Sequence, residues 1–235
     1  LGFTSGANLT TVNVKGAYGA SADIGTNGSS ITKVTTLDAS ANTAGTLLTT
    51  GGQVGALTVT GSGAADTLTV GAVGTGGSIT ANMGAGNDIV SSTQAIIAAQ
   101  NFTGGAGTDI LRIADTATST TQALTVSDGS FVNMSGFETI DISAAHAGDI
   151  IFTLGGYANA LAAAATNKTL NITAKAAVVA VVLDVITIDA SALASGNAVT
   201  MDIKNVGTAT DAASPLTLTG SSGNDTITLE EGFAA

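Results

Sequence analysis

The chain has 235 residues, and its 31 glycines and 3% aromatic residues exclude an ordinary globular core built from large rings. The formal net charge of −11 excludes nucleic acid and anionic lipid surfaces as partners, because like charges repel, whereas a hard cation would be attracted. Cysteine is absent, so disulfides and thiolate metal sites are excluded as well.

Hydrophobic residues make up 44% of the chain and are almost all Ala, Val, Ile and Leu. β-branched side chains favour strands, and low charge with positive mean hydropathy argues against disorder. We therefore expect an all-β fold with a narrow interior of stacked aliphatic side chains. The longest aliphatic run, 176–183, is much shorter than the roughly 20 residues of a membrane span, so we expect a buried strand and no membrane insertion.

The first repeated element along the chain is the strand pattern Thr-(Leu/Ile)-Asp-(Ala/Ile)-Ser-Ala, at residues 36–41, 139–144 and 187–192. Alternation of apolar and polar residues predicts half-buried strands. Each copy carries one aspartate, and we expect these side chains to cap turns or to bond neighbouring Ser and Thr on the outer face. Further cation ligands at a second corner are the alternative. The three aspartates are Asp38, Asp141 and Asp189.

The second repeated element is a Gly-rich loop that ends in Asp and continues as a short alternating run. Its copies begin at residues 61, 83, 104 and 220. The first three loop aspartates, Asp66, Asp88 and Asp109, are 22 and 21 residues apart. In a coiled β-structure with one such corner per coil, successive corners stack about 4.8 Å apart. The spacing therefore predicts a parallel β-solenoid or β-roll-like fold.

The order of strand pattern, spacer and Gly/Asp loop occurs twice, which indicates an ancient tandem duplication. Asp38 leads to Asp66, and Asp189 leads to Asp225. We expect one solenoid segment over residues 1–145 with three loops, and a second over 146–235 with one. A short helix near 157–167 is the one expected interruption, because this stretch is rich in Ala.

The loops have the composition of a calcium site. Residues 104–109 read Gly-Gly-Ala-Gly-Thr-Asp, whereas Ala64, Met83 and Ser221 each replace a glycine in the other loops. Glycine permits positive φ and lets carbonyl oxygens face an ion, and Asp adds a charged oxygen. Calcium takes about six to eight oxygen ligands, so a stacked neighbouring loop must complete the shell. Without an ion, the same residues would be ordinary turns.

The loops resemble RTX repeats, because residues 104–112 match the nonapeptide pattern of that family. Sparse loops between long Thr/Ala/Val-rich stretches, together with residues 135–143, are similar to calcium-dependent bacterial S-layer proteins exported by type I secretion. The resemblance covers residues 57–145 and 187–229 and implies a right-handed solenoid with calcium between its loops. The implied metal-binding residues are Gly61, Gly63, Asp66, Gly84, Gly86, Asp88, Gly105, Gly107, Asp109 and Asp225.

The resemblance further implies a secreted protein of the bacterial cell surface that folds in calcium-rich medium and self-associates into a lattice. Attachment to cell-surface polysaccharide would use regions absent from this sequence. Leu1 opens without a signal-peptide pattern, so we expect a fragment of a longer protein. The alternative function is a calcium-stiffened module of a secreted RTX adhesin or hydrolase.

An enzymatic function is not expected. His146 is the only histidine, and neither a G-x-S-x-G nucleophile elbow nor a zinc-binding H-E-x-x-H motif is present. We expect His146 to be a solvated side chain in a loop.

Overall fold

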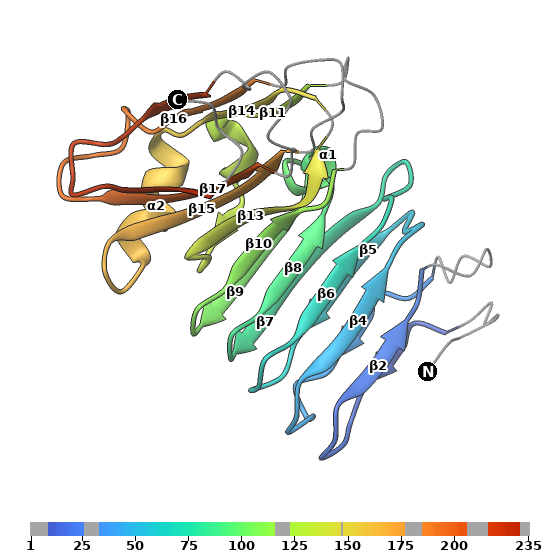
Figure 1. Cartoon of the computed structure of the whole chain (residues 1–235). Coiled ribbons are helices and arrows are strands. Elements are labelled where there is room, and N and C mark those ends of the chain that lie inside the picture. The colour runs from blue at the N-terminus through green and yellow to red at the C-terminus, as the bar shows by residue number, and fades with distance from the viewer. Residues whose placement is uncertain are drawn as a thin grey trace. The chain divides into compact units, whose positions relative to one another are not determined.

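The computed structural model describes residues 9–25, 33–115, 123–146, 148–176, 185–205 and 216–230. The chain divides into two compact units. Unit 1 comprises Leu1–Leu111 and Asn133–Phe137, and unit 2 comprises Arg112–Val132 and Glu138–Ala235. In each unit, parallel strands alternate between two sheets (Figure 1). This confirms the all-β, parallel solenoid or β-roll-like fold. We predicted one solenoid segment over residues 1–145 with three loops and a second over 146–235 with one. This boundary stays a prediction.

Unit 1 takes one strand for each sheet from every coil. The first sheet has the order β1 (Thr11–Asn13), β3 (Thr36–Asp38), β5 (Ala56–Thr60), β7 (Ser78–Ala85), β9 (Asn101–Ala106) and β12 (Met134–Ser135). The second contains β2 (Ala20–Asp23), β4 (Thr46–Thr50), β6 (Thr67–Val70), β8 (Ile89–Ser92) and the first half of β10 (Ile110–Ile113). The short helix α1 (Gln94–Ile97) precedes β9.

The alternating sequence forms these strands because every second side chain reaches the interior. Thr58, Thr80 and Asn101 are register partners in β5, β7 and β9, at intervals of 22 and 21 residues, and all three face outward. The inward positions form columns of buried side chains. One such column is Leu37, Val59, Ala81, Phe102 and Met134.

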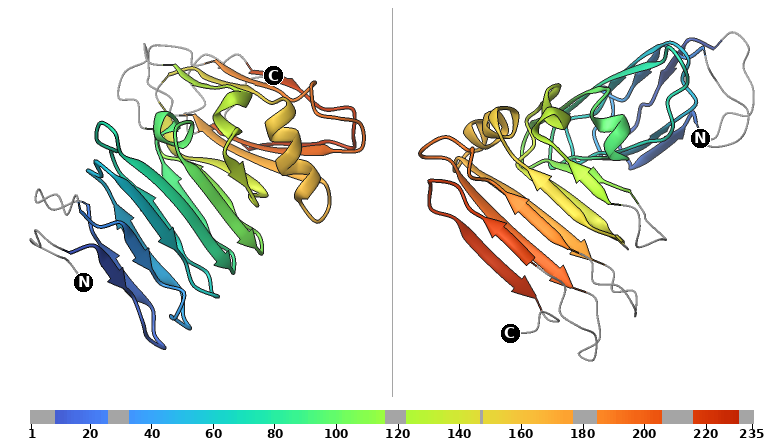
Figure 2. Two further views of the ribbon diagram at one scale, coloured as in Figure 1. Left: turned by 180° about the vertical axis from the view of Figure 1, so that it is seen from behind. Right: turned by 90° about the horizontal axis from the view of Figure 1, so that it is seen from above.

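Unit 2 has longer coils. One sheet contains β13 (Thr139–His146), β15 (Thr169–Ala176), β17 (Ala198–Asn205) and β19 (Thr226–Glu230). The other contains β11 (Leu124–Val126), β14 (Ile150–Thr153), β16 (Ile186–Asp189) and β18 (Leu216–Thr219). A 3₁₀ helix, η1 (Asp128–Phe131), and α2 (Gly156–Ala164) interrupt the coil (Figure 2). The expected helix at 157–167 is α2, and it ends earlier because Ala165 is extended.

The interior is mostly aliphatic, as predicted, with one addition. Four of the six phenylalanines are completely buried, so rings fill part of the core despite their scarcity. They are Phe102, Phe131, Phe137 and Phe152. Of the buried strand expected at 176–183, only Ala176 lies within the described residues. Over the same described ranges, no helix is long and apolar enough to cross a membrane.

Candidate metal site

Asp66, Asp88 and Asp109 lie at the same corner of successive coils in unit 1, directly before β6, β8 and β10. The spacing in the sequence predicted this stacking. Their side chains point into the interior, with exposed fractions of only 2%, 0% and 0%. A completely buried carboxylate requires hydrogen-bond donors or a cation to offset the loss of water.

Main-chain N–H groups of neighbouring coils supply such donors. The N–H of Asp66 donates to Oδ1 of Asp88 over 2.7 Å, and the N–H of Asp88 donates to Oδ1 of Asp109 over 2.8 Å. At the N-terminal end of the row, the N–H and the hydroxyl of Thr46 both donate to Oδ1 of Asp66 over 2.6 Å. We call this row the aspartate ladder. Charge-assisted hydrogen bonds of this kind tie each coil to the next one.

The predicted loop glycines of β7 and β9 are required by the stacking itself. Gly84 and Gly105 are register partners, with φ of 100° and 122°. Gly86 and Gly107 also have positive φ, 127° and 144°. A Cβ on Gly105 would overlap the carbonyl oxygen of Gly84, and a Cβ on Gly107 would overlap that of Gly86. Backbone therefore packs directly on backbone, and this need for glycine exists with or without an ion.

In the first loop, only one of the two predicted glycines packs in this way. A Cβ on Gly61 would overlap the carbonyl oxygen of Met83, whereas a Cβ on Gly63 would meet nothing within 4 Å. Between them, the N–H of Ser62 donates to Oδ2 of Asp66 over 2.6 Å, and its hydroxyl lies 3.0 Å from Oδ1. A serine at this position thus replaces glycine with an additional hydrogen bond to the ladder, a role that sequence reasoning missed.

At Asp88, an atom of the ladder fits a cation. Oδ2 of Asp88 is buried and has no hydrogen-bond partner within the described part of the chain. Burial is the largest cause that raises the pKa of Asp88 to about 7. The charges of Asp109 and Asp66 raise this pKa further, while the N–H of Asp66 lowers it. A positive ion at this oxygen would stabilise the ionised form.

A complete calcium shell is not assembled from side chains. Over the residues that the structure describes, no three His, Cys, Asp or Glu side chains are grouped to hold a metal ion. The remaining oxygens of a shell would have to be loop carbonyls. Two of these already accept hydrogen bonds, since Ala85 donates to Ser62 over 3.4 Å and Gly86 donates to Ala106 over 2.8 Å. Each carbonyl still has a second lone pair.

The fourth loop, in unit 2, repeats the arrangement of the first. Asp225 lies directly before β19, and its Oδ1 accepts the N–H of Val199 in the preceding coil over 2.9 Å. Ser221 corresponds to Ser62, because its hydroxyl donates to Oδ1 of Asp225 over 2.6 Å. This shared set of hydrogen bonds supports the predicted duplication. Asp225 is only half-buried, unlike the three ladder aspartates.

The strand-pattern aspartates do not join the candidate site. Oδ1 of Asp38 accepts the N–H of Ser40, and Oδ1 of Asp189 accepts the N–H of Ser191, both over 2.9 Å. These bonds confirm the expected turn caps. Hydrogen bonds from the two serines hold the pKa of Asp38 and the pKa of Asp189 below the usual value.

Two residues of unit 2 show features that sequence reasoning did not predict. Oδ2 of Asp141 accepts from Nε of Arg112 over 2.8 Å. His146 was expected in a loop, but it is the last residue of β13. The side chain of His146 lies outside the described residues.

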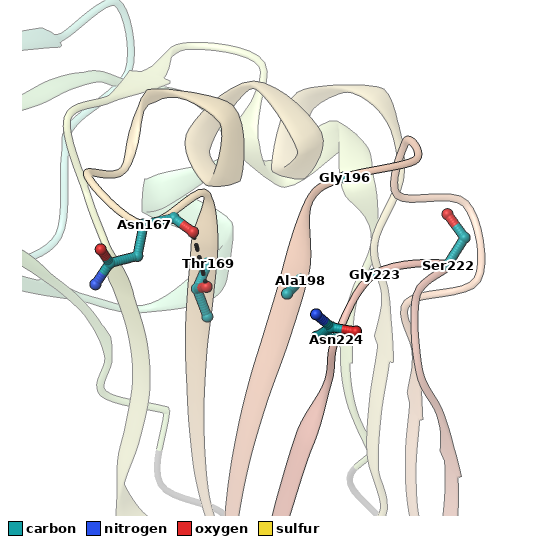
Figure 3. A pocket seen from close by; sticks show the side chains of 7 residues that line it. All are labelled: Asn167, Thr169, Gly196, Ala198, Ser222, Gly223 and Asn224. Atoms are coloured by element: carbon teal, nitrogen blue, oxygen red, sulfur yellow. Dashed lines mark hydrogen bonds between the residues drawn. The ribbon is translucent and has the colours of Figure 1, made fainter.

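A concave surface of about 370 Å³ lies beside the fourth loop in unit 2 (Figure 3). We call it the corner groove. Three consecutive coils line it, because Thr169 begins β15, Ala198 begins β17, and Asn224 immediately precedes Asp225. None of its lining residues carries a charge. They are Asn167, Thr169, Gly196, Ala198, Ser222, Gly223 and Asn224.

Comparison with protein-family models, with curated proteins and with solved structures gave no match.

Proposed function

We propose that this chain is a structural protein of the bacterial cell surface whose folding and assembly depend on calcium bound between stacked Gly/Asp loops. The observation that carries this proposal is the buried Oδ2 of Asp88, which has no hydrogen-bond partner in the described part of the chain. It lies in a row where three carboxylates follow each other on successive coils.

Calcium would act on the stability of the coil stack. Carboxylates brought together on neighbouring coils repel one another, and burial adds to the cost of their charge. An ion held at Oδ2 of Asp88, with loop carbonyl oxygens completing its shell, would offset both penalties. Because the unfolded chain has no such row of carboxylates, calcium binding would be coupled to folding. A chain synthesised at low calcium would then complete folding outside the cell.

Self-association into a lattice and type I secretion are supported by the resemblance of the loops to RTX S-layer proteins. A stack of short parallel coils, bonded to one another by sheets and in unit 1 also by the ladder, is suited to a rigid structural role. The alternative is a calcium-stiffened module of a secreted adhesin or hydrolase. The two differ in assembly, because only the lattice protein is expected to form ordered arrays when calcium is added.

The test is thermal melting monitored by circular dichroism, in calcium and in chelator. Calcium at about 100 times its dissociation constant contributes about 2.7 kcal/mol, which raises the Tm by roughly 5–10 °C for a chain of this size. We expect this shift in the wild type and in Asp38→Asn, which changes a turn cap, but not in Asp88→Asn. An equal shift in Asp88→Asn, or none in the wild type, would refute the proposal. Electron microscopy after calcium addition then distinguishes a lattice protein from a module.

A further inference from the structure

We propose that the corner groove of unit 2 binds a neutral, hydroxyl-rich sugar residue of a glycan. This goes beyond the proposed function, since none of its polar lining side chains is a candidate calcium ligand. The groove has the volume of a small ligand site, about 370 Å³. Its walls come from three coils that the sheet β15–β17–β19 holds in fixed register, so it is formed before any ligand arrives.

The polar groups of the groove are available to a ligand. The side chains of Asn167, Ser222 and Asn224 are exposed, and none of them hydrogen-bonds to the described part of the protein. The amide of Asn224 and the hydroxyl of Ser222 therefore have unused donors and acceptors at the groove, whereas the amide of Asn167 points away from both (Figure 3). An amide presents a donor and an acceptor side by side, which matches two adjacent hydroxyl groups of a sugar ring.

The absence of charge among the lining residues favours one class of ligand. No lining residue is acidic or basic. The nearest carboxylate along the chain, that of Asp225, accepts hydrogen bonds from Val199 and Ser221 through its Oδ1. An anionic ligand would find no counter-charge among the lining residues, and apart from the exposed Lys168 between Asn167 and Thr169 it would meet a chain of net charge −11. An apolar ligand would find little more than the methyl group of Ala198. A neutral polyhydroxyl compound is the remaining class.

Close backbone packing forms the floor of the groove. A Cβ on Gly223 would overlap the carbonyl oxygen of Asn197, so the fourth loop lies directly on the preceding corner. That corner is anchored in turn, because Nδ2 of Asn197 donates to Oδ1 of Asn159 in α2 over 2.6 Å. Gly196 has φ of 91° and open space around its Cβ position, which leaves the mouth of the groove clear. A preorganised site loses less entropy on binding.

The experiment is a titration of the whole chain with small probes in calcium-containing buffer. Binding is monitored by NMR of the Asn side-chain amides. The neutral probes are D-glucose, D-galactose, D-mannose and N-acetylglucosamine, and the charged probes are D-glucuronate and inorganic phosphate. We expect at least one neutral sugar to shift the amides of Asn167 and Asn224, with a Kd on the order of 1 mM. The charged probes are expected to shift neither amide.

Three variants make the test specific. Asn224→Ala removes two hydrogen-bonding groups and should weaken binding about tenfold. Ser222→Tyr places a ring at an exposed position and should block the groove. Asn101→Ala, an exposed asparagine on β9 of unit 1, is the matched control and should bind like the wild type. Melting curves of all variants establish that they are folded.

The proposal is overturned if no neutral sugar shifts these amides at saturating concentration, if glucuronate binds as well as glucose, or if Asn224→Ala binds with wild-type affinity. These outcomes can be distinguished from failure of the calcium proposal. That proposal is tested by the melting temperature, and its variants, Asp38→Asn and Asp88→Asn, change no side chain of the groove.

Discussion

At the scale of single residues, burial of the Asp88 side chain disfavours its negative charge. Its pKa in the folded protein is about 7, against an ordinary value of 3.8. An acid whose pKa is raised by folding stabilises the folded state only while it is protonated. In chelator, the free energy of unfolding should therefore be highest near pH 4 and fall as the pH rises through about 7. The loss should total about 4 kcal/mol, because about 3 pKa units separate the two values at about 1.4 kcal/mol each, and it should level off above pH 7.

Urea denaturation between pH 5 and pH 8 in chelator measures this effect, with Asp88→Asn as the comparison. The amide keeps the shape of the side chain and does not titrate, so the pH dependence should disappear in this variant. If both proteins lose the same free energy of unfolding between these pH values, Asp88 is not its source.

Substitutions of the loop glycines can distinguish a role in packing from a role in ion binding. Gly105 has φ of 122°, and a Cβ there would overlap Gly84, whereas Gly63 has open space around its Cβ position. Gly105→Ala should lower the free energy of unfolding by about 1–3 kcal/mol, both in calcium and in chelator. Gly63→Ala should change it by less than about 1 kcal/mol. Equal losses for the two variants in urea denaturation would contradict this view of the stacked loops.

At the scale of elements, α2 depends on a residue far away in the sequence. Its own N-cap, Gly155, has no side chain to cap it. Asp128 of η1 takes this role, because Oδ1 accepts from Gly155 over 2.8 Å and from Ala158 over 2.9 Å, and Oδ2 accepts from Tyr157 over 3.1 Å. A carboxylate at a helix N-terminus also interacts favourably with the helix dipole.

Asp128→Ala should therefore lower the free energy of unfolding by about 1–2 kcal/mol. Asp128→Asn should lose less, because its amide oxygen still accepts a hydrogen bond. Hydrogen exchange of the α2 amides should rise in both variants, in the same order. If exchange rises equally throughout the chain, the cap is not local to α2, and the assignment of this role to Asp128 is wrong.

The elements also show what the sequence could and could not predict. The intervals between Asp66, Asp88 and Asp109 predicted neighbouring coils, because a corner repeated at the length of one coil must stack. That the carboxylates accept N–H groups in the interior was not predictable, since the loop pattern does not fix the direction of the side chains. Likewise, the pair of Arg112 and Asp141 depends on a register between strands that no local pattern encodes.

At the scale of the whole chain, the unequal distribution of the loops predicts an unequal response to calcium. Three of the four Gly/Asp loops belong to unit 1, whereas unit 2 has only the loop that ends at Asp225. The Oδ1 atom of that aspartate already accepts from Val199 and Ser221. In a stack of coils, stabilisation of one coil extends mainly to its nearest neighbours. Calcium should therefore protect β6 and β8 more strongly than β15 and β17.

Hydrogen–deuterium exchange with mass spectrometry, in calcium and in chelator, resolves this difference along the chain. We expect the largest gain in protection in peptides that cover residues 61–92, and a smaller gain in peptides that cover 169–205. In Asp88→Asn, the gain over 61–92 should be lost, while the exchange of 169–205 should be unchanged. A gain confined to residues 216–230 would place the calcium site at the fourth loop, because only a ligand bound there would protect its own coil and leave the aspartate ladder unaffected.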